Sequence, residues 1–505
     1  MKLLNAISIV SIVLASLVAP GARAQESRAA ITIRVEAGAR QKFAGFGAGV
    51  GNWGRDYQKL TGAERARLSR FLWGGLRFKS LRLWLNLNQY APTRGARLSA
   101  DFRARYIDSG IIADARKNGV VDLLLAPDGA PDYLKRKRDG GAADFAIPDE
   151  NLAEYGALIA DFIAQIRDET GVLLNVTGVQ NEPNDLDRIA PSQFGALVTA
   201  LRAALDGRGL QKVQIIAPES ANVDGVFYET VENLKADAGA WRALSGVASH
   251  SYNMAATEKA AQLVAGSGKS YWMTEASANG PETPGDALQA ASLASRFLSD
   301  MNHRVTHWMH FLGFETPDAN DNATRIIAYT THPLQATVFQ KYFTYRQLSR
   351  VFEVGARFRH SQSSLEGEMT WTYGPKPRLT AAAAQNPDGS WAIGLANFTA
   401  PNFSAAPAEN GYANGFEAQN FDVTVQIPEL ANVKSLRFGI ERSGLQNGAP
   451  KPLEMKAGQL LIADVAPLQV VTLRSLKPGK PPAPASMGAA RTRDSSSKAR
   501  ADLPK

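Results

Sequence analysis

Short apolar runs alternate with segments of helical periodicity between about residues 43 and 345. The clearest helical segment starts at Pro191, and apolar residues at positions 194, 197, 198, 201 and 205 follow the 3.6-residue period of an amphipathic helix. Eight strand–helix units over about 300 residues favour a (β/α)8 TIM barrel of the α/β class over a doubly wound open sheet. The predicted strands are 43–48, 81–86, 121–127, 175–181, 213–218, 246–251, 270–275 and 305–311.

The pattern changes near residues 346–355, after which the helical period disappears. Short alternating runs at 391–398, 421–427, 460–463 and 468–473 predict an antiparallel β-sandwich over residues 346–476. The segment 31–35 also alternates, so we expect residues 25–42 to supply an N-terminal strand to this second domain. The barrel is then expected over residues 43–345.

The first 24 residues have the composition of a secretory signal peptide. Lys2 precedes an apolar run over 6–18, and Ala22-Arg23-Ala24 is a small-x-small cleavage site. A membrane anchor is the alternative, but about 13 apolar residues are too few to span ~30 Å of hydrocarbon. We therefore expect an exported protein, periplasmic or extracellular, with no membrane insertion after the signal is removed.

Charge is concentrated at the ends of the chain. The 505 residues carry a formal net charge of +8, but residues 477–505 hold seven basic and two acidic residues, and residues 1–24 hold two basic ones. The last segment is rich in Pro, Ser and basic residues, which predicts a disordered basic tail. The folded middle is nearly neutral, so the charge does not indicate a nucleic-acid partner. The absence of Cys excludes thiolate zinc sites, iron–sulfur clusters and Cys nucleophiles.

Two acidic residues follow predicted strands. Glu182 ends the fourth strand, in Val-Gln-Asn-Glu-Pro, and Glu275 ends the seventh, in Trp-Met-Thr-Glu. Barrel active sites lie at the carboxyl ends of the strands, and a pair of carboxyl groups there suits glycoside hydrolysis. The alternative is that each Glu caps the next helix or forms a solvated ion pair.

Several motifs in this order resemble glycoside hydrolase family 30, within the clan of retaining (β/α)8 glycosidases. The similarity covers about residues 31–475, and it implies the barrel and side β-domain already expected from the pattern. Its motifs are Gln-Lys-Phe-Ala-Gly-Phe-Gly at 41–47, Gln-Asn-Glu-Pro at 180–183, Ala-Pro-Glu at 217–219, Ser-His-Ser-Tyr at 249–252, Trp-Met-Thr-Glu at 272–275, and Tyr-Phe-Thr-Tyr-Arg-Gln-Leu-Ser-Arg-Val-Phe at 342–352.

The resemblance implies roles for individual residues. Glu182 is expected to be the acid/base and Glu275 the nucleophile, and Asn181 is expected to hydrogen-bond the sugar 2-hydroxyl. The remaining implied substrate-binding residues lie on other strands. They are Arg82, which would keep the nucleophile ionised, Tyr252, which would hold it, His250 beside it, and Trp308, which would form the floor of the sugar subsite.

The chain departs from the family after the third strand, where an aromatic residue is expected and Asp128 stands instead. Asp128 is either a ligand of a sugar hydroxyl or a turn residue. This departure puts the substrate of the family's characterised branches in doubt and leaves the catalytic pair untouched.

Weaker signals do not change this interpretation. His303, His307 and His310 cluster in sequence, but His307 and His310 have opposite parity on a strand, so no metal site and no cofactor are expected. The basic run 135–138 is interpreted as a solvated loop, with contact to an acidic sugar as the alternative. A serine hydrolase is not indicated, because the sequence has no Gly-x-Ser-x-Gly elbow.

The sequence therefore predicts an exported, monomeric, retaining β-glycosidase that acts on a β-linked polysaccharide or oligosaccharide. Retention requires the two carboxyl groups about 5–5.5 Å apart, whereas about 9 Å would indicate inversion. The first alternative is a carbohydrate-binding protein that has lost activity on the same scaffold. The second is an adhesin that holds anionic envelope polymers through its basic tail.

Overall fold

The computed structural model describes residues 28–50, 56–96, 100–137, 145–183, 189–252, 256–363, 365, 378–399, 418–443 and 451–476. The predicted signal peptide and basic tail lie outside these residues. Within the described ranges, no helix has both the length and the apolar character needed to cross a membrane.

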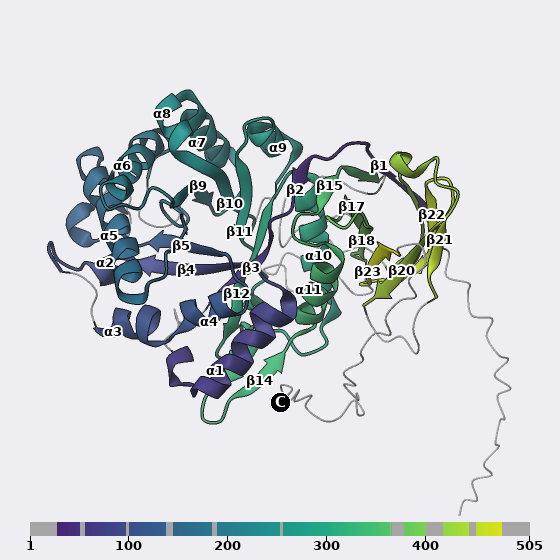
Figure 1. The fold of residues 1–505 in the computed structure, drawn as a ribbon, viewed down its shortest axis with the longest axis horizontal. Coiled ribbons are helices and arrows are strands. Elements are labelled where there is room, and N and C mark those ends of the chain that lie inside the picture. The colour runs from purple at the N-terminus through teal and green to yellow at the C-terminus, as the bar shows by residue number, and fades with distance from the viewer. Residues whose placement is uncertain are drawn as a thin grey trace, which may run out of the picture.

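Eight parallel strands close into a barrel, which confirms the predicted fold class (Figure 1). Each strand pairs with the next, and β11 pairs with β12 and β12 with β3 to complete the ring. The barrel strands are β3 (Gly45–Gly49), β4 (Ser80–Asn86), β5 (Asp122–Asp128), β8 (Val176–Thr177), β9 (Gln214–Ser220), β10 (Leu244–His250), β11 (Ser270–Glu275) and β12 (His307–Glu315).

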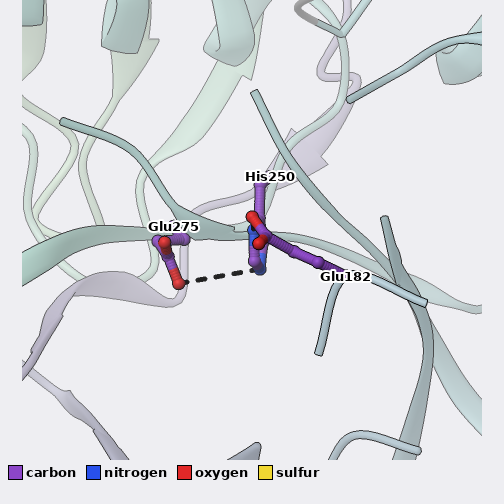
Figure 2. Close-up of side chains that lie close together, drawn as sticks. All are labelled: Glu182, His250 and Glu275. Atoms are coloured by element: carbon purple, nitrogen blue, oxygen red, sulfur yellow. Dashed lines mark hydrogen bonds and ion pairs between the residues drawn. The ribbon is translucent and has the colours of Figure 1, made fainter. Parts of the chain in front are cut away.

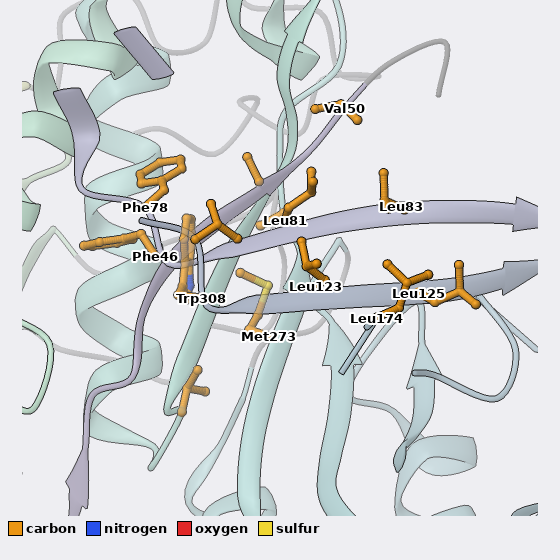
Figure 3. Packing of buried hydrophobic residues seen from close by; sticks show 14 of the residues in the cluster. Phe46, Val50, Phe78, Leu81, Leu83, Leu123, Leu125, Leu174, Met273 and Trp308 are labelled. Atoms are coloured by element: carbon orange, nitrogen blue, oxygen red, sulfur yellow. The ribbon is translucent and has the colours of Figure 1, made fainter. Parts of the chain in front are cut away.

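Alternating side chains along these strands divide the core into two layers. On β10, Ala248 packs inside the barrel, whereas Val247 packs outward against the helices. The inner cluster also contains Trp272 and Met309. The outer layer is much larger, and Figure 3 shows part of it. Because successive residues of a strand face opposite sides, this alternation determines which residues can reach the barrel mouth.

Helices surround the barrel, and their ends carry the expected signals. The helix predicted from Pro191 is present: a 3-10 turn over Pro191–Gln193 leads into α6 (Phe194–Asp206). The remaining helices are α1 (Gly62–Ser69), α2 (Leu87–Tyr90), α3 (Ala100–Arg103), α4 (Ile111–Lys117), α5 (Leu152–Thr170), α7 (Gly225–Ala236), α8 (Ala238–Ala243), α9 (Glu258–Val264), α10 (Ala287–Asn302) and α11 (Gln340–Val351).

Two stretches differ from the sequence prediction. The fourth strand, expected over 175–181, has regular ladder pairing only at β8, and Glu182 after it adopts a left-handed backbone with φ 46°. After β12 the chain adds β13 (Arg325–Thr330), parallel to β12, and β14 (Gln335–Val338), antiparallel to β13, which the sequence did not predict.

The second domain is a sandwich of two sheets beside the barrel (Figure 1). The predicted N-terminal strand, β1 (Ala29–Val35), joins it by pairing parallel to β19 (Phe421–Gln426) and antiparallel to β16 (Ser361–Ser363). β22 (Gln459–Val465) completes this four-stranded sheet. The other sheet contains β2 (Gln41–Lys42), β15 (Arg357–Arg359), β17 (Leu379–Gln385), β18 (Trp391–Asn397), β23 (Val470–Ser475), β20 (Leu436–Arg442) and β21 (Leu453–Met455).

Apolar side chains from both sheets fill the sandwich, and polar contacts fix it to the barrel. Ile33 and Val423 of one sheet share a buried cluster with Ile393 of the other. At the junction, the Asn302 side chain of α10 donates to the carbonyl of Ala381, at 2.9 Å. α11 runs unbroken through the predicted boundary at 345/346, so one helix connects the two domains.

Candidate active site

Side chains from the carboxyl ends of four barrel strands converge at one mouth of the barrel. β4 supplies Arg82, the segment after β8 supplies Asn181 and Glu182, β10 supplies His250, and β11 ends on Glu275. Figure 2 shows Glu182 and Glu275 reaching toward His250 from different strands. These positions are separated by up to 193 residues in sequence, and the barrel topology brings them together.

Arg82 is the centre of this cluster. Its neighbours Leu81 and Leu83 pack in the outer layer, so the alternation of β4 directs Arg82 inward, where it is fully buried. One guanidinium nitrogen donates to Oε2 of Glu275. The other, Nη2, donates to Oδ1 of Asn181 at 2.5 Å and lies 3.2 Å from Nε2 of His250.

The two predicted catalytic acids lie close together. One carboxyl oxygen of Glu182, one of Glu275 and a ring nitrogen of His250 all lie within 4.8 Å of one another. Tyr252 donates its hydroxyl to Oε1 of Glu275 at 2.5 Å. The Glu275 carboxylate therefore receives hydrogen bonds on both oxygens, from Arg82 and from Tyr252.

Glu182 has a different environment. Its side chain is 22% exposed, against 6% for Glu275, so it is the more accessible of the two acids. Burial raises the pKa of Glu182 above its usual range, and the nearby Arg82 charge opposes this only in part. Glu182 is thus disposed to hold a proton, in contrast to the doubly hydrogen-bonded Glu275.

The contacts of His250 define its tautomer. Burial lowers the pKa of His250 to about 3, so the ring is neutral at ordinary pH. Arginine has donors only, so Nε2 of His250 must accept from Arg82. Nδ1 then carries the proton and donates it to Oε1 of Glu182, 2.8 Å away.

Backbone contacts hold the acid in place. Glu182 lies in the left-handed region of φ, which is uncommon for residues other than glycine and often occurs at functional sites. Its N–H donates to the carbonyl of Glu219 at 3.1 Å, and the N–H of Asn181 donates to the carbonyl of Pro127 at 2.6 Å. Contacts from β9 and β5 thus replace the ladder pairing that β8 lacks at this point.

The Glu182–His250–Glu275 group has donor atoms spaced as in a metal site, but those atoms are already engaged. Both nitrogens of His250 are in hydrogen bonds, and the Arg82 guanidinium already neutralises Glu275. A divalent cation would lie against this fixed positive charge, so the donor set does not fit a metal.

The clustered histidines do not converge within the described residues. The His307 ring stacks on Trp272 with centroids 3.4 Å apart, and His310 lies 3.0 Å from the hydroxyl of Tyr345. His303 bonds the carbonyl of Ser299 at 2.8 Å. Each ring therefore has its own structural contact.

The prediction that Trp308 forms the floor of the sugar subsite disagrees with the structure. Trp308 is fully buried in the outer layer, beside Phe46 (Figure 3), and donates Nε1–H to Asp300 of α10 at 2.8 Å. Its side chain points away from the barrel axis because its neighbour on β12, Met309, faces inward.

A different aromatic pair lies at the mouth, which the sequence reasoning missed. Trp84 and Phe311 pack edge-to-face with centroids 5.4 Å apart, and the Arg82 guanidinium lies over the Trp84 ring at 4.6 Å. The signal was present, because Trp84 is two residues after Arg82 on one strand and must share its face. Asp128 ends β5 beside Asn86 of β4, at the same rim.

The basic run beside the mouth has acidic neighbours. Lys135 pairs with Asp132 at 2.9 Å and Arg136 with Glu150 at 2.7 Å. Position 138 lies outside the described residues. These two charges are therefore at least partly compensated within the chain.

Comparison with solved structures places this fold among glycoside hydrolases. The catalytic domain of a family 30 xylanase C from Talaromyces cellulolyticus superposes with a TM-score of 0.64 at 14% identity, over 88% of this chain and 100% of that one. A subfamily 8 family 30 xylanase from Clostridium acetobutylicum gives 0.61 at 18% identity, over 88% and 99%. An endo-β1,6-glucanase gives 0.61 at 17% identity, over 88% and 95%. No protein-family model and no curated protein matches the sequence.

Proposed function

We propose that this protein is a retaining β-glycosidase, in which Glu275 is the nucleophile and Glu182 the acid/base. The observation that carries the proposal is the approach of the two carboxyl groups, with oxygens within 4.8 Å. With one oxygen of each acid this close, the separation matches the ~5–5.5 Å of retaining enzymes better than the ~6.5–9.5 Å of inverting ones.

The two acids differ in the way the reaction requires. Glu275 accepts from Arg82 and Tyr252, which stabilises its carboxylate before attack. Glu182 has a raised pKa and accepts from His250 on Oε1, so Oε2 is left to carry the proton toward the leaving group. The two environments thus differ: two donors hold the Glu275 carboxylate, whereas burial favours the protonated form of Glu182.

The reaction then runs in two displacements. Glu275 bonds to the anomeric carbon as the glycosidic bond breaks, and the leaving oxygen takes the proton of Glu182. In the second step, water gives a proton to Glu182 and its oxygen bonds to the anomeric carbon, which releases Glu275. The product keeps the starting anomeric configuration.

The rim residues favour a carbohydrate as the substrate. Asn181, next to the acid, is proposed to hydrogen-bond the sugar 2-hydroxyl, and Asp128 a further hydroxyl. Trp84 and Phe311 offer apolar surface to the C–H face of a sugar, the role first expected of Trp308. The fold is similar to that of xylanases and of an endo-β1,6-glucanase, which supports a β-linked polysaccharide or oligosaccharide as the substrate. We propose that the enzyme is exported, which the predicted signal peptide at residues 1–24 supports. We also propose that it acts as a monomer.

The proposal is tested by screening the purified chain against a panel of β-linked xylans and glucans, and reading the product anomer by NMR at early times. We expect hydrolysis with the β-anomer formed first. An α-anomer formed first would contradict retention.

A matched pair of variants separates an enzyme from a binding protein. Glu275→Gln is expected to lower kcat by a factor on the order of 10⁴ or more while sugar binding persists. Glu315→Gln makes the same change at the end of β12 and is expected to leave turnover within about threefold, as for changes outside a catalytic unit. Sugar binding by a wild type that hydrolyses nothing in the panel would favour the inactive binding protein.

A further inference from the structure

A third carboxyl group lies beneath the proposed catalytic pair. Glu219, near the end of β9, is fully buried, and its Oε1 lies 3.4 Å from Nη2 of Arg82. Arg82 is therefore shared between Glu219 and Glu275. Since His250 is neutral, this guanidinium is, among the described residues, the one cation in contact with both Glu219 and Glu275.

Glu219 touches both halves of the catalytic pair. Its carbonyl accepts the N–H of Glu182 at 3.1 Å, and its side chain meets the guanidinium that holds Glu275. Its own backbone is left-handed, with φ 60°. Glu219 thus contacts the acid/base through its main chain, and it is linked to the nucleophile through Arg82.

The chain leaves space for this carboxyl group at Gly178. A Cβ at Gly178 would lie 1.8 Å from Oε2 of Glu219, so any other residue there would collide with it. Oε2 has no well-formed hydrogen bond among the described residues, although the Thr274 hydroxyl is near enough to lower the pKa of the carboxyl group. A buried carboxylate oxygen without a firm donor is costly, whereas a protonated one is much less so.

The charges around Glu219 also favour its neutral form. Burial, with a smaller contribution from the charge of Glu275, raises its pKa to about 7 against the opposing charge of Arg82. Among the described residues, the groups that act on its carboxyl group are Arg82 from β4 and Thr274 and Glu275 from β11, and its main chain meets Glu182. Arg82 can balance one negative charge, and its contact with Glu275 leaves none to balance a second carboxylate at Glu219.

We propose that Glu219 is a positioning residue that holds a proton in the active enzyme, which leaves the positive charge of Arg82 to the Glu275 carboxylate. The inference rests on the proposed glycosidase function for its kinetic consequence, whereas the protonation itself does not depend on it. Above neutral pH, Glu219 loses its proton and competes with Glu275 for Arg82. The enzyme then loses activity for a reason separate from the ionisation of Glu182.

The protonation is tested without turnover. Wild type and Glu219→Gln are labelled with ¹³C at the glutamate carboxyl carbon, and spectra are recorded from about pH 5 to about pH 9. We expect the signal missing from the variant to move near pH 7, whereas exposed glutamates move near their usual ~4.3. A Glu219 signal already at its ionised position at pH 5 would overturn the proposal and leave the glycosidase assignment untouched.

The kinetic consequence is tested in a Glu182→Gln background, which needs no change at Glu219. The substrate is an activated aryl β-glycoside of the sugar identified in the screen, whose leaving group departs without an acid. We expect kcat/KM to fall about tenfold or more between about pH 6 and about pH 8, a change worth roughly one pKa unit of interaction.

Adding Glu219→Gln to that background should remove the fall, because Gln keeps a neutral acceptor for Arg82 and cannot ionise. A flat profile in Glu182→Gln alone, or an unchanged fall in the double variant, would show that Glu219 only fills space.

Discussion

Arg82 and Lys341 are two buried cations that contact carboxyl groups, and they differ in the number of carboxyl groups around them. Lys341 of α11 donates to Glu282 at 2.5 Å and to the carbonyl of Ala323 at 2.6 Å, and both charged side chains are almost fully buried. Arg82 is as deeply buried but meets two carboxyl groups, on Glu219 and Glu275.

The difference lies in the balance of charge. Lys341 contacts one carboxyl group, that of Glu282, and the more distant charges of Asp286 and Arg325 have opposite signs. Burial lowers the pKa of Lys341 and raises that of Glu282 to about 7. At Arg82 acidic groups outnumber the cation, and Glu182 beside them reaches solvent. A fully buried ion pair with balanced charge has a structural role. At the barrel mouth, carboxyl groups outnumber the cation and one of them reaches solvent, so they can hold and transfer protons in a reaction.

Arg82→Met tests the contrast most strongly. Removing the guanidinium takes a donor from Glu275 and leaves both Glu219 and Glu275 without their cation, so kcat/KM is expected to fall on the order of 10³-fold. Steady-state kinetics against the substrate from the screen would measure this, with circular dichroism to confirm folding. A folded Arg82→Met protein with more than about a tenth of wild-type kcat/KM would contradict the assigned role.

Lys341→Met makes the same substitution in the other cluster and should have the opposite outcome. Loss of one partner from a buried pair typically costs about 3–5 kcal/mol, and we expect a loss near the lower end because Glu282 can take up a proton. Urea unfolding would measure it, and kcat per folded molecule should stay within about threefold of wild type, as for changes outside the catalytic cluster. A selective loss of kcat would instead connect Lys341 to the catalytic centre.

The sequence predicted the barrel because its strands are buried runs separated by amphipathic helices, a pattern that depends only on local composition. It also placed Glu275 at the end of its strand, whereas Glu182 lies in the segment after β8 and not at a strand end. β8 was predicted too long because contacts from β5 and β9, remote in sequence, take over the backbone hydrogen bonds after Thr177. The β13–β14 hairpin was missed for a similar reason, since its apolar residues lie where helical and strand patterns overlap.

Side-chain direction explains the other errors. The family resemblance placed Trp308 at the mouth, but its orientation is set by the register of β12. The position of Trp84 could have been predicted, because it lies two residues after Arg82 on β4 and therefore faces the same side of the strand. Lys341 and Glu282 are 59 positions apart and follow no recognisable spacing, so only the folded chain reveals that pair.

Trp308→Phe tests the expectation that a tryptophan in the core contributes to stability and not to substrate binding, whereas an aromatic residue at the barrel mouth contributes to substrate binding. The variant loses the donor to Asp300, a fully buried carboxylate whose pKa burial raises to about 6. We expect a loss of about 1–3 kcal/mol in the free energy of unfolding, the cost of an unsatisfied buried acceptor, with KM unchanged.

Trp84→Phe is its matched control at the mouth and should raise KM several-fold with a smaller loss of stability. The result that would reverse the assignment is a raised KM in Trp308→Phe with no change in Trp84→Phe.

Tyr252→Phe should have the smallest effect and refines the comparison within the catalytic cluster. The variant removes one of the two donors to Glu275 and keeps the stronger, charged one from Arg82, so we expect kcat to fall about tenfold, equivalent to the ~1.4 kcal/mol of one neutral hydrogen bond. Tyr271→Phe is the control, because Tyr271 lies on the adjacent strand in the outer layer and its hydroxyl is hydrogen-bonded to the Ser249 hydroxyl at 3.2 Å, not to Glu275. Equal losses of kcat in the two variants would mean that the Tyr252 hydroxyl contributes packing alone. A loss confined to Tyr252→Phe would show that Glu275 depends on a neutral donor in addition to the Arg82 charge, an addition that the Lys341 pair lacks.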